Sequence, residues 1–230
     1  ARRARRRRGA LLVLPRGARP GPGASLLLAI SGGQDSMALL KLLYDLKRLY
    51  KWKLNIWHGD HGWHKKSKII AHELKNWCAQ KNLSFFCEET TQEQTKTENS
   101  AREWRYKHLI RQASQLSLES NDTDYIYVVT GHTSSDRAET LIMNLARGTD
   151  LAGLTTLKEE RMLSTNIKLI RPLLCFSREE TKQICKEQQL PIWLDPSNEN
   201  LNFSRNKIRK QILPMLEELH TVLHDIVNAI

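Results

Sequence analysis

The chain has 230 residues and a formal net charge of +11, and most of that charge lies at one end. Eight of its 36 basic residues fall in residues 1–24, which hold no acid, so 28 basic side chains remain against 25 acidic ones. No apolar run approaches the roughly 20 residues that a membrane-spanning helix needs, so we expect no membrane partner. The length is sufficient for a buried core.

The cysteine pattern excludes two common kinds of site. No two cysteines have the C-x-x-C spacing of a zinc knuckle or a redox pair. Packed, reduced thiols are the simpler interpretation, and they indicate a reducing compartment: the cytoplasm or, alternatively, the plastid stroma. The four residues are Cys78, Cys87, Cys175 and Cys185.

Residues 1–24 differ in composition from everything that follows. They consist mainly of Arg, Pro, Gly and Ala, whereas the remainder is rich in Lys, Asn, Ile and Gln. Such a segment could be a transit peptide, an RNA-binding tail or sequence unrelated to the folded unit. We predict a disordered N-terminal extension and assign it no function.

The strongest local pattern begins directly after this extension. Residues 26–30 form a purely apolar run, as expected of a strand buried on both faces. The run ends at Ser31-Gly32-Gly33, and from Ser36 to Tyr50 leucines recur at helical spacing. A strand, a glycine turn and a helix N-terminus form an anion site, because unpaired N–H groups and the helix dipole converge there. The turn has neither the Lys of a Walker loop nor the G-x-G-x-x-G of a dinucleotide fold.

The rest of the chain alternates between strand and helix patterns. Strands are predicted at residues 53–57, 84–87, 125–130 and 167–170, and helices at 67–80, 98–116, 138–146, 177–189 and from about 204. Ser134 is an N-cap candidate, and Ser177 with Glu180 has the spacing of a capping box. This alternation predicts a doubly wound parallel α/β sheet with helices on both faces. Ligands of such sheets bind beyond the carboxyl ends of the strands, where we expect the turns at 31–36, 58–61 and 131–132 to face one another.

A histidine and two acids follow the predicted strand at 125–130. Asp136 and Glu139 are three residues apart and share one face of the helix that begins there, next to His132. Acids in a first helical turn can simply be a solvated cap. They also lie where phosphates bound at the glycine turn would arrive, and Mg²⁺ commonly bridges phosphates and one or two carboxylates.

Two groups of arginines complete the candidate residues. Arg102 and Arg105 lie on one stripe of the predicted helix at 98–116, although Glu98 and Arg102 could equally form an i,i+4 surface ion pair. Arg205 and Arg209 share a face of the last predicted helix and suit phosphate.

The order of these motifs resembles one enzyme family closely. Ser31–Ser36 (SGGQDS) looks like the SGGxDS loop of the PP-loop ATP pyrophosphatases, which adenylate an oxygen of a substrate. The full set resembles the catalytic domain of the tRNA(Ile)-lysidine synthetases, in particular their short cyanobacterial and plastid branch. It consists of SGGQDS, HGDHGWH, TENSAREWRY, GHTSSDRAET, RGTDLAGL, IRPLL and DPSNENLNFSRNKIR.

The resemblance implies a fold and a reaction. The fold is that of the adenine-nucleotide α-hydrolases, with residues 25–200 as the catalytic domain and 201–230 as a basic helical segment that completes it. ATP, with Mg²⁺, adenylates the 2-carbonyl oxygen of the wobble cytidine in isoleucine tRNA with a CAU anticodon, and the amine of free L-lysine displaces AMP. The sequence leaves open whether the chain forms a homodimer.

The resemblance also implies residue roles. Ser31, Gly32, Gly33, Gln34 and Ser36 would hold the pyrophosphate, and Asp35 would bind Mg²⁺ with Asp136. His132, Asp136 and Glu139 would form the lysine and metal side of the site. Arg102 or Arg105, together with Arg205 and Arg209, would bind nucleotide or tRNA phosphates. The implied catalytic set is Asp35, Arg105, His132, Asp136, Glu139 and Arg205.

The chain departs from the family pattern in two places. Many members carry two adjacent acids where this chain has Ser135-Asp136, which implies fewer carboxylates at the metal. Longer members also have a C-terminal domain that grips the tRNA, and the chain ends before it.

Two alternatives stay open from sequence alone. A tRNA thiolation enzyme of the same superfamily would normally need paired cysteines, and a non-catalytic nucleotide- or RNA-binding module would not need the acids and arginines.

Overall fold

The computed structural model describes residues 19–62, 66–91, 93–95, 97–120, 125–150, 157–193, 199, 201 and 203–219. The first 18 residues of the predicted N-terminal extension lie outside this set, as do residues 63–64, 151–154, 195–198, 200 and 202 of the quoted motifs and residues 220–230 of the predicted C-terminal segment. Residues 19–24, which we placed in the extension, lie against the domain. Gly23 N donates to the Tyr50 carbonyl at 2.8 Å, Trp52 Nε1 donates to the Gly21 carbonyl at 3.0 Å, and Ala24 is buried.

The predicted sheet is present and nearly all parallel. It contains β1 (Ser25–Ala29), β2 (Lys53–Asp60), β3 (Ser84–Glu89), β4 (Ile126–Thr130), β5 (Glu160–Ser164) and β6 (Ile167–Ile170), in the order β3-β2-β1-β4-β6-β5. Only β5 runs antiparallel, as the outer arm of a hairpin with β6. The sequence analysis missed β5 because it is a half-buried and exposed edge strand with no apolar alternation.

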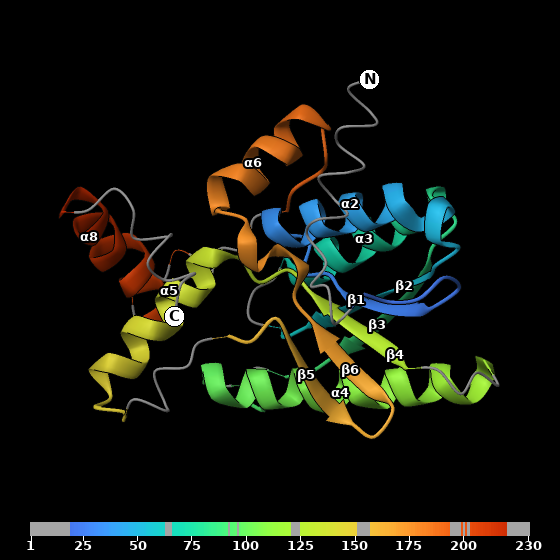
Figure 1. The fold of residues 1–230 in the computed structure, drawn as a ribbon, viewed down its shortest axis with the longest axis horizontal. Helices are drawn as coiled ribbons and strands as arrows, with labels where there is room; N and C mark the ends of the chain where they lie inside the picture. Colours follow the sequence, from blue (N-terminus) through green and yellow to red (C-terminus); the bar gives the residue numbers. More distant parts are fainter. Residues whose placement is uncertain are drawn as a thin grey trace.

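Helices cover both faces of this sheet (Figure 1). On one side lie α2 (Gln34–Tyr50) and α3 (Ser67–Gln80), with α6 (Arg178–Glu187) packed against α2, and on the other lies α4 (Glu98–Ser120). Beyond the sheet α5 (Ser134–Ala146) packs with the final helical stretch, α7 (Ser204–Lys207), the π-helical turn η3 (Ile208–Ile212) and α8 (Leu213–Leu219). A short 3₁₀ turn, η1 (Pro172–Cys175), follows β6.

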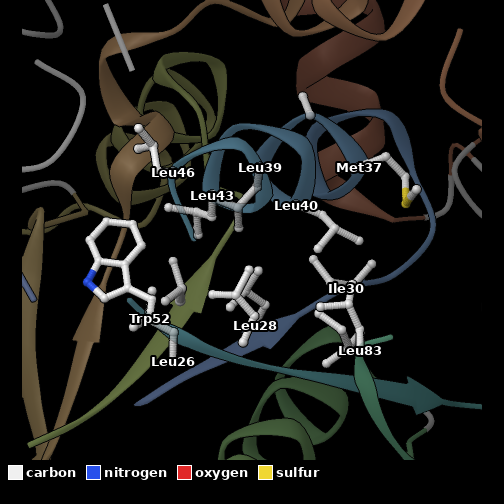
Figure 2. Packing of buried hydrophobic residues seen from close by; sticks show 14 of the residues in the cluster. Leu26, Leu28, Ile30, Met37, Leu39, Leu40, Leu43, Leu46, Trp52 and Leu83 are labelled. Atoms are coloured by element: carbon white, nitrogen blue, oxygen red, sulfur yellow. The ribbon is translucent and has the colours of Figure 1, made fainter. Parts of the chain in front are cut away.

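Side chains of the apolar run of β1 belong to two separate hydrophobic clusters, one on each face of the sheet, as expected of a strand that is buried on both faces. Leu26, Leu28 and Ile30 pack under α2; Figure 2 shows Ile30 beneath Leu40, and Leu26 at the other end of the cluster near Trp52. Leu27 points to the opposite face and joins the cluster beneath α4. These side chains are fully buried or nearly so, which fixes the position of the glycine turn that follows them.

Several helix ends differ from the sequence prediction. The N-cap of α5 is Thr133 rather than Ser134, because the Thr133 N–H and hydroxyl both donate to the Asp136 carboxylate, at 2.9 and 3.0 Å. Helix α4, predicted at 98–116, continues to Ser120, and the final helical stretch, predicted from about 204, runs across Pro214 to Leu219 through η3. Proline has no N–H for the regular α-helical ladder, and the wider π turn lies directly before it. The predicted capping box of Ser177 and Glu180 is confirmed.

Candidate active site

The site lies at the topological switch point of the sheet. The chain leaves β1 toward β2 on one side and later returns to place β4 on the other side of β1. In open α/β sheets this arrangement leaves a crevice beyond the carboxyl ends of the two central strands. A cleft of about 660 Å³ is present there, and residues of all three predicted strand-end turns, at 31–36, 58–61 and 131–132, line it.

In the glycine turn the Gly33 N–H donates to Ser31 Oγ at 3.3 Å, and the N–H groups of residues 34–36 in the first turn of α2 are available to an anion. Gly32 has φ +87°, which a side chain would strain, and Gly33 caps α2 without a side-chain acceptor. Ser36 Oγ donates to the Gly33 carbonyl at 2.8 Å and holds the turn closed. A Cβ on Gly32 would lie 3.1 Å from the Trp193 ring. Trp193 therefore covers the outer side of the turn and leaves the inner side available to an anion.

Gly131, at the end of β4, brings the other half of the site against the first turn of α2. A Cβ at Gly131 would lie 3.2 Å from the backbone carbonyl of Asp35 and from Ser36 Cα. Only glycine allows this approach, and it places His132 and Asp136 on the same cleft as Asp35.

Asp35 is held by the first turns of α6. Its Oδ1 accepts a hydrogen bond from the Thr181 hydroxyl at 2.5 Å, and its Oδ2 lies 3.8 Å from Arg178 Nη2. Burial raises the pKa of the Asp35 carboxyl, and the Thr181 hydrogen bond and Arg178 only partly oppose this. The carboxylate therefore carries its charge at an energetic cost that a cation would relieve.

The side chain of Gln34 lines the cleft and contacts α6. Its Nε2 donates to the Arg178 carbonyl at 2.7 Å and to Thr181 Oγ1 at 2.9 Å. Gln34 thus ties α6 to the glycine turn, and its contact with pyrophosphate stays a prediction.

His132 and Asp136 stand close together at the start of α5. His132 Nδ1 lies 2.8 Å from Thr130 Oγ1, and burial, with Arg171 and Arg205 nearby, lowers the pKa of His132. Burial alone would raise the pKa of Asp136, but His132, Arg205 and the Thr133 N–H outweigh it, so the net shift is downward. At neutral pH the pair is a neutral imidazole beside a carboxylate.

Glu139 occupies a different position from the one expected of a lysine- or metal-facing acid. It is fully buried, and its two oxygens accept hydrogen bonds from Arg205 Nε at 2.8 Å and from Arg209 Nε and Nη2 at 2.5 and 2.9 Å. Both arginines also lie 3.6–4.0 Å from Asp136 Oδ1. Glu139 therefore links α5 to the final helical stretch and orients the guanidiniums of Arg205 and Arg209, which both line the cleft.

Arg102 and Arg105 both line the cleft from α4, so the structure does not select one of them. In the described part of the chain Arg102 stacks on the Tyr106 ring, 5.0 Å from its centroid, rather than pairing with Glu98. Burial lowers the pKa of Arg105, and the neighbouring Arg102 and Arg205 act in the same direction.

Comparison with known proteins agrees with this geometry. The family model described as a PP-loop domain matches residues 15–216. The chain belongs to the PP-loop family. A PP-loop protein of solved structure, the U34-tRNA thiolase NcsA of Methanococcus maripaludis with its [4Fe-4S] cluster, aligns over 97% of the chain and 76% of its own, with TM-score 0.70 and 18% identity. At that identity the likeness concerns the fold alone.

More similar PP-loop sequences carry one recurring name. A tRNA(Ile)-lysidine synthase of Prochlorococcus marinus is 60% identical over 198 residues, which is 86% of this chain and 59% of the relative. The chloroplastic tRNA(Ile)-lysidine synthase of Pyropia yezoensis is 39% identical over 194 residues, 84% of this chain and 56% of the relative. The chain thus spans a little under three fifths of the length of these two relatives.

Three functional candidates in this PP-loop site escaped the sequence analysis. Thr181 and Arg178 contact Asp35 across more than 140 residues of sequence, and Arg171 lies beside His132. The capping box at Ser177 located the start of α6, but no sequence signal indicated that this helix would dock on the glycine turn. Within the described residues, no three His, Cys, Asp or Glu side chains form a ready metal site, and no helix is long and apolar enough to cross a membrane.

Proposed function

We propose that this chain carries the catalytic site of a tRNA(Ile)-lysidine synthetase. ATP would adenylate the 2-carbonyl oxygen of the wobble cytidine in CAU-anticodon isoleucine tRNA, and free L-lysine would then complete the reaction. The observation that carries the proposal is the 60% identity to a relative of that name, together with a cleft that joins the glycine turn, Asp35, His132 and Asp136. Its compartment would be the cytoplasm or the plastid stroma.

The residues divide the chemistry between two ends of the cleft. In the first step the cytidine oxygen bonds to the α-phosphorus of ATP as the bond to pyrophosphate breaks, and the first-turn N–H groups of residues 34–36 would stabilise the departing charge. In the second step a lysine amine bonds to C2 of the base, and AMP leaves with the former carbonyl oxygen. Asp136 suits the cationic end of lysine, and neutral His132 adds no opposing charge.

Asp35 is the residue best fitted to hold Mg²⁺, with Asp136 as the second carboxylate. The ion would supply charge neutralisation for the phosphates. The fit rests on the raised pKa of Asp35, to which the Asp136 charge contributes, and on the cost of its buried charge. Two carboxylates agree with the usual habit of Mg²⁺, which takes few protein ligands and keeps phosphates and water for the rest.

Thr181 should govern how well Asp35 holds that ion. Thr181→Val removes the donor to Asp35 Oδ1 and leaves Gln34 Nε2 without one of its acceptors. We expect the Mg²⁺ concentration for half-maximal pyrophosphate release to rise about 10-fold, in the range typical for groups that orient metal ligands. Titration calorimetry with Mg²⁺ and a non-hydrolysable ATP analogue gives a second readout. Thr181→Ser keeps the hydroxyl and should behave as the wild type; a Val variant with unchanged Mg²⁺ dependence would remove this role.

A thiolation enzyme is the less favoured second candidate. The four cysteines lie on different elements, α3, β3, η1 and α6, and two of them are buried. Burial raises the pKa of Cys78 to about 12 and that of Cys185 to about 11, so neither is a ready thiolate.

The deciding experiment is transfer of radiolabelled lysine to a CAU-anticodon isoleucine tRNA transcript, with ATP and Mg²⁺. We expect label on this tRNA and none on a methionine tRNA. Pyrophosphate release that depends on tRNA but gives no lysine label would indicate adenylation for another nucleophile. Absence of both signals would contradict the proposal.

A further inference from the structure

We propose that Arg102, Tyr106, Arg161 and Arg171 form a second anion site, which binds a phosphodiester of the RNA substrate next to the adenylation cleft. We call these four residues the arginine–tyrosine cluster. The inference rests on the proposed function in that the RNA is the same substrate, but it concerns residues for which neither the motifs nor the comparisons assign a role, apart from Arg102.

The cluster is built around one phenol ring on α4. The guanidinium carbons of Arg102 and Arg161 lie 5.0 and 4.8 Å from the Tyr106 ring centroid. Arg171 lies close enough to Tyr106 to lower the pKa of its hydroxyl, and Arg171 Nη1 donates to the Lys158 carbonyl at 2.5 Å. Three cations from three elements, α4, β5 and the end of β6, thus converge on a single aromatic side chain.

The fold explains why these elements meet. Arg161 pairs in register with Leu169, and Leu169 belongs to the core beneath α4, so Arg161 lies on the α4 face of the hairpin. Arg171 follows directly on Ile170 at the carboxyl end of β6. The cluster therefore occupies the β6–β5 half of the same sheet edge whose β1 half holds the glycine turn.

Charge in the cluster is unbalanced. The groups that most affect the pKa of Arg171, besides its burial, are Tyr106, Arg161 and Arg102. Arg171 is 2% exposed, and its buried Nε has no hydrogen-bond partner among the described residues. Glu160, the acidic neighbour of Arg161, lies 3.7 Å from Lys168 instead. Packed like charges of this kind are relieved by an anion.

The layout favours RNA over a second mononucleotide. Arg102 and Tyr106 line the cleft, whereas Arg161 is exposed on the outer strand, so Arg102 and Arg161 form a track leading out of the site, while the buried Arg171 adds positive charge beside Tyr106. An extended polyanion can contact both ends of such a track. Guanidinium planes beside an aromatic ring are also the surfaces on which single-stranded RNA stacks its bases while its phosphates are neutralised.

The test compares Arg161→Gln with Arg48→Gln in the full 230-residue chain. Arg48 is an exposed arginine in the last turn of α2, at the end of that helix remote from the glycine turn, so the change of charge is identical. We expect Arg161→Gln to weaken binding of the CAU-anticodon isoleucine tRNA transcript about 5- to 10-fold. The slope of log K against log salt should fall by roughly 0.7, the value for one lost phosphate contact on a single strand. Arg48→Gln should change neither.

Three further measurements distinguish an RNA site from a nucleotide site and from simple packing of Arg161 on Tyr106. ATP affinity should stay within about twofold in Arg161→Gln, because Arg161 does not line the cleft; equal losses for ATP and RNA would assign the cluster to the nucleotide and overturn the proposal. Arg161→Lys keeps the charge and should keep the salt slope. If Arg161→Lys bound RNA as weakly as Arg161→Gln and also had a lower melting temperature, Arg161 would have only a packing role, and the proposal would be overturned.

Failure of this inference is distinguishable from failure of the proposed function. Lysine transfer by the wild type, with RNA binding equal in Arg161→Gln and Arg48→Gln, would refute the cluster and leave the reaction standing. The expected loss of RNA affinity without any lysine transfer would support the cluster and refute the reaction. A wild-type chain that binds no tRNA would refute both.

Discussion

An Asp35→Asn variant is expected to lose at least about 100-fold in pyrophosphate release and yet to melt about 2 °C higher than the wild type. The loss follows from removing the charge that would hold Mg²⁺ at the phosphates. The gain follows from burial, which raises the pKa of Asp35 and so makes its ionised form costly in the folded protein. Asparagine keeps an oxygen for the Thr181 hydroxyl without that cost. Sites of this kind trade stability for function.

The pH dependence of the melting temperature tests the cause. The folded carboxyl keeps its proton to higher pH than the unfolded one, so the wild type loses stability as pH rises from 3.8 through the raised pKa. The advantage of Asn should therefore be full at pH 8 and shrink toward pH 4, in melts without ATP or Mg²⁺. Asp45→Asn is the matched control, because Asp45 lies on the same helix in an exposed pair with Lys41. Wild-type pyrophosphate release by Asp35→Asn would refute the metal assignment.

A Glu139→Gln variant is expected to lose about 3–5 kcal/mol of unfolding free energy, the usual result of removing one partner from a buried ion pair. Glu139 is fully buried and accepts three hydrogen bonds from Arg205 and Arg209. An amide offers one acceptor oxygen and no charge, which leaves two guanidiniums beside α5 with only the Asp136 carboxylate, at 3.6–4.0 Å, to balance them. Urea denaturation measures the loss directly, and activity should fall with it because Arg205 is no longer aimed into the cleft.

Glu179→Gln is the matched control for this prediction. Glu179 pairs with Lys182 at 3.2 Å on the surface of α6, with 78% of its side chain exposed. Exposed pairs contribute roughly 0–1 kcal/mol, so the control should unfold almost as the wild type does. If Glu139→Gln cost under about 1 kcal/mol and instead raised the lysine concentration needed for turnover, Glu139 would face the ligand as the family resemblance implied.

The sequence predicted those parts of the molecule that short stretches determine. The apolar run of β1 and the glycine turn after it depend on neighbouring residues, and so does the capping box at Ser177. The position of the crevice could also be predicted, because alternating strands and helices are compatible with only a few sheet topologies. Placement of His132 and Asp136 beside Asp35 follows from that topology alone.

The contacts that the sequence did not predict are made between residues that lie far apart in the chain. A lone threonine in α6 carries no sign that it will donate to Asp35. The spacing of Asp136 and Glu139 is the same whether both face a ligand or one is taken by arginines, and only the packing of α7 and η3 on α5 decides between these roles. Edge strand β5 buries little apolar surface, so its residues need not show a strand pattern.

The contacts that α6 and Trp193 make with the glycine turn also constrain folding during synthesis. Gln34 and Asp35 bond to residues of α6 that come 144 to 147 positions later, and Trp193 N donates to the Gly32 carbonyl. During synthesis the turn leaves the ribosome together with β1 and α2, but its partners follow only when residues 178–193 have been translated. A nascent chain can therefore form β1, β2 and β3 before the glycine turn has its contacts with α6 and Trp193. The contacts that complete the glycine turn are therefore made only after the segment that would receive the RNA has been translated.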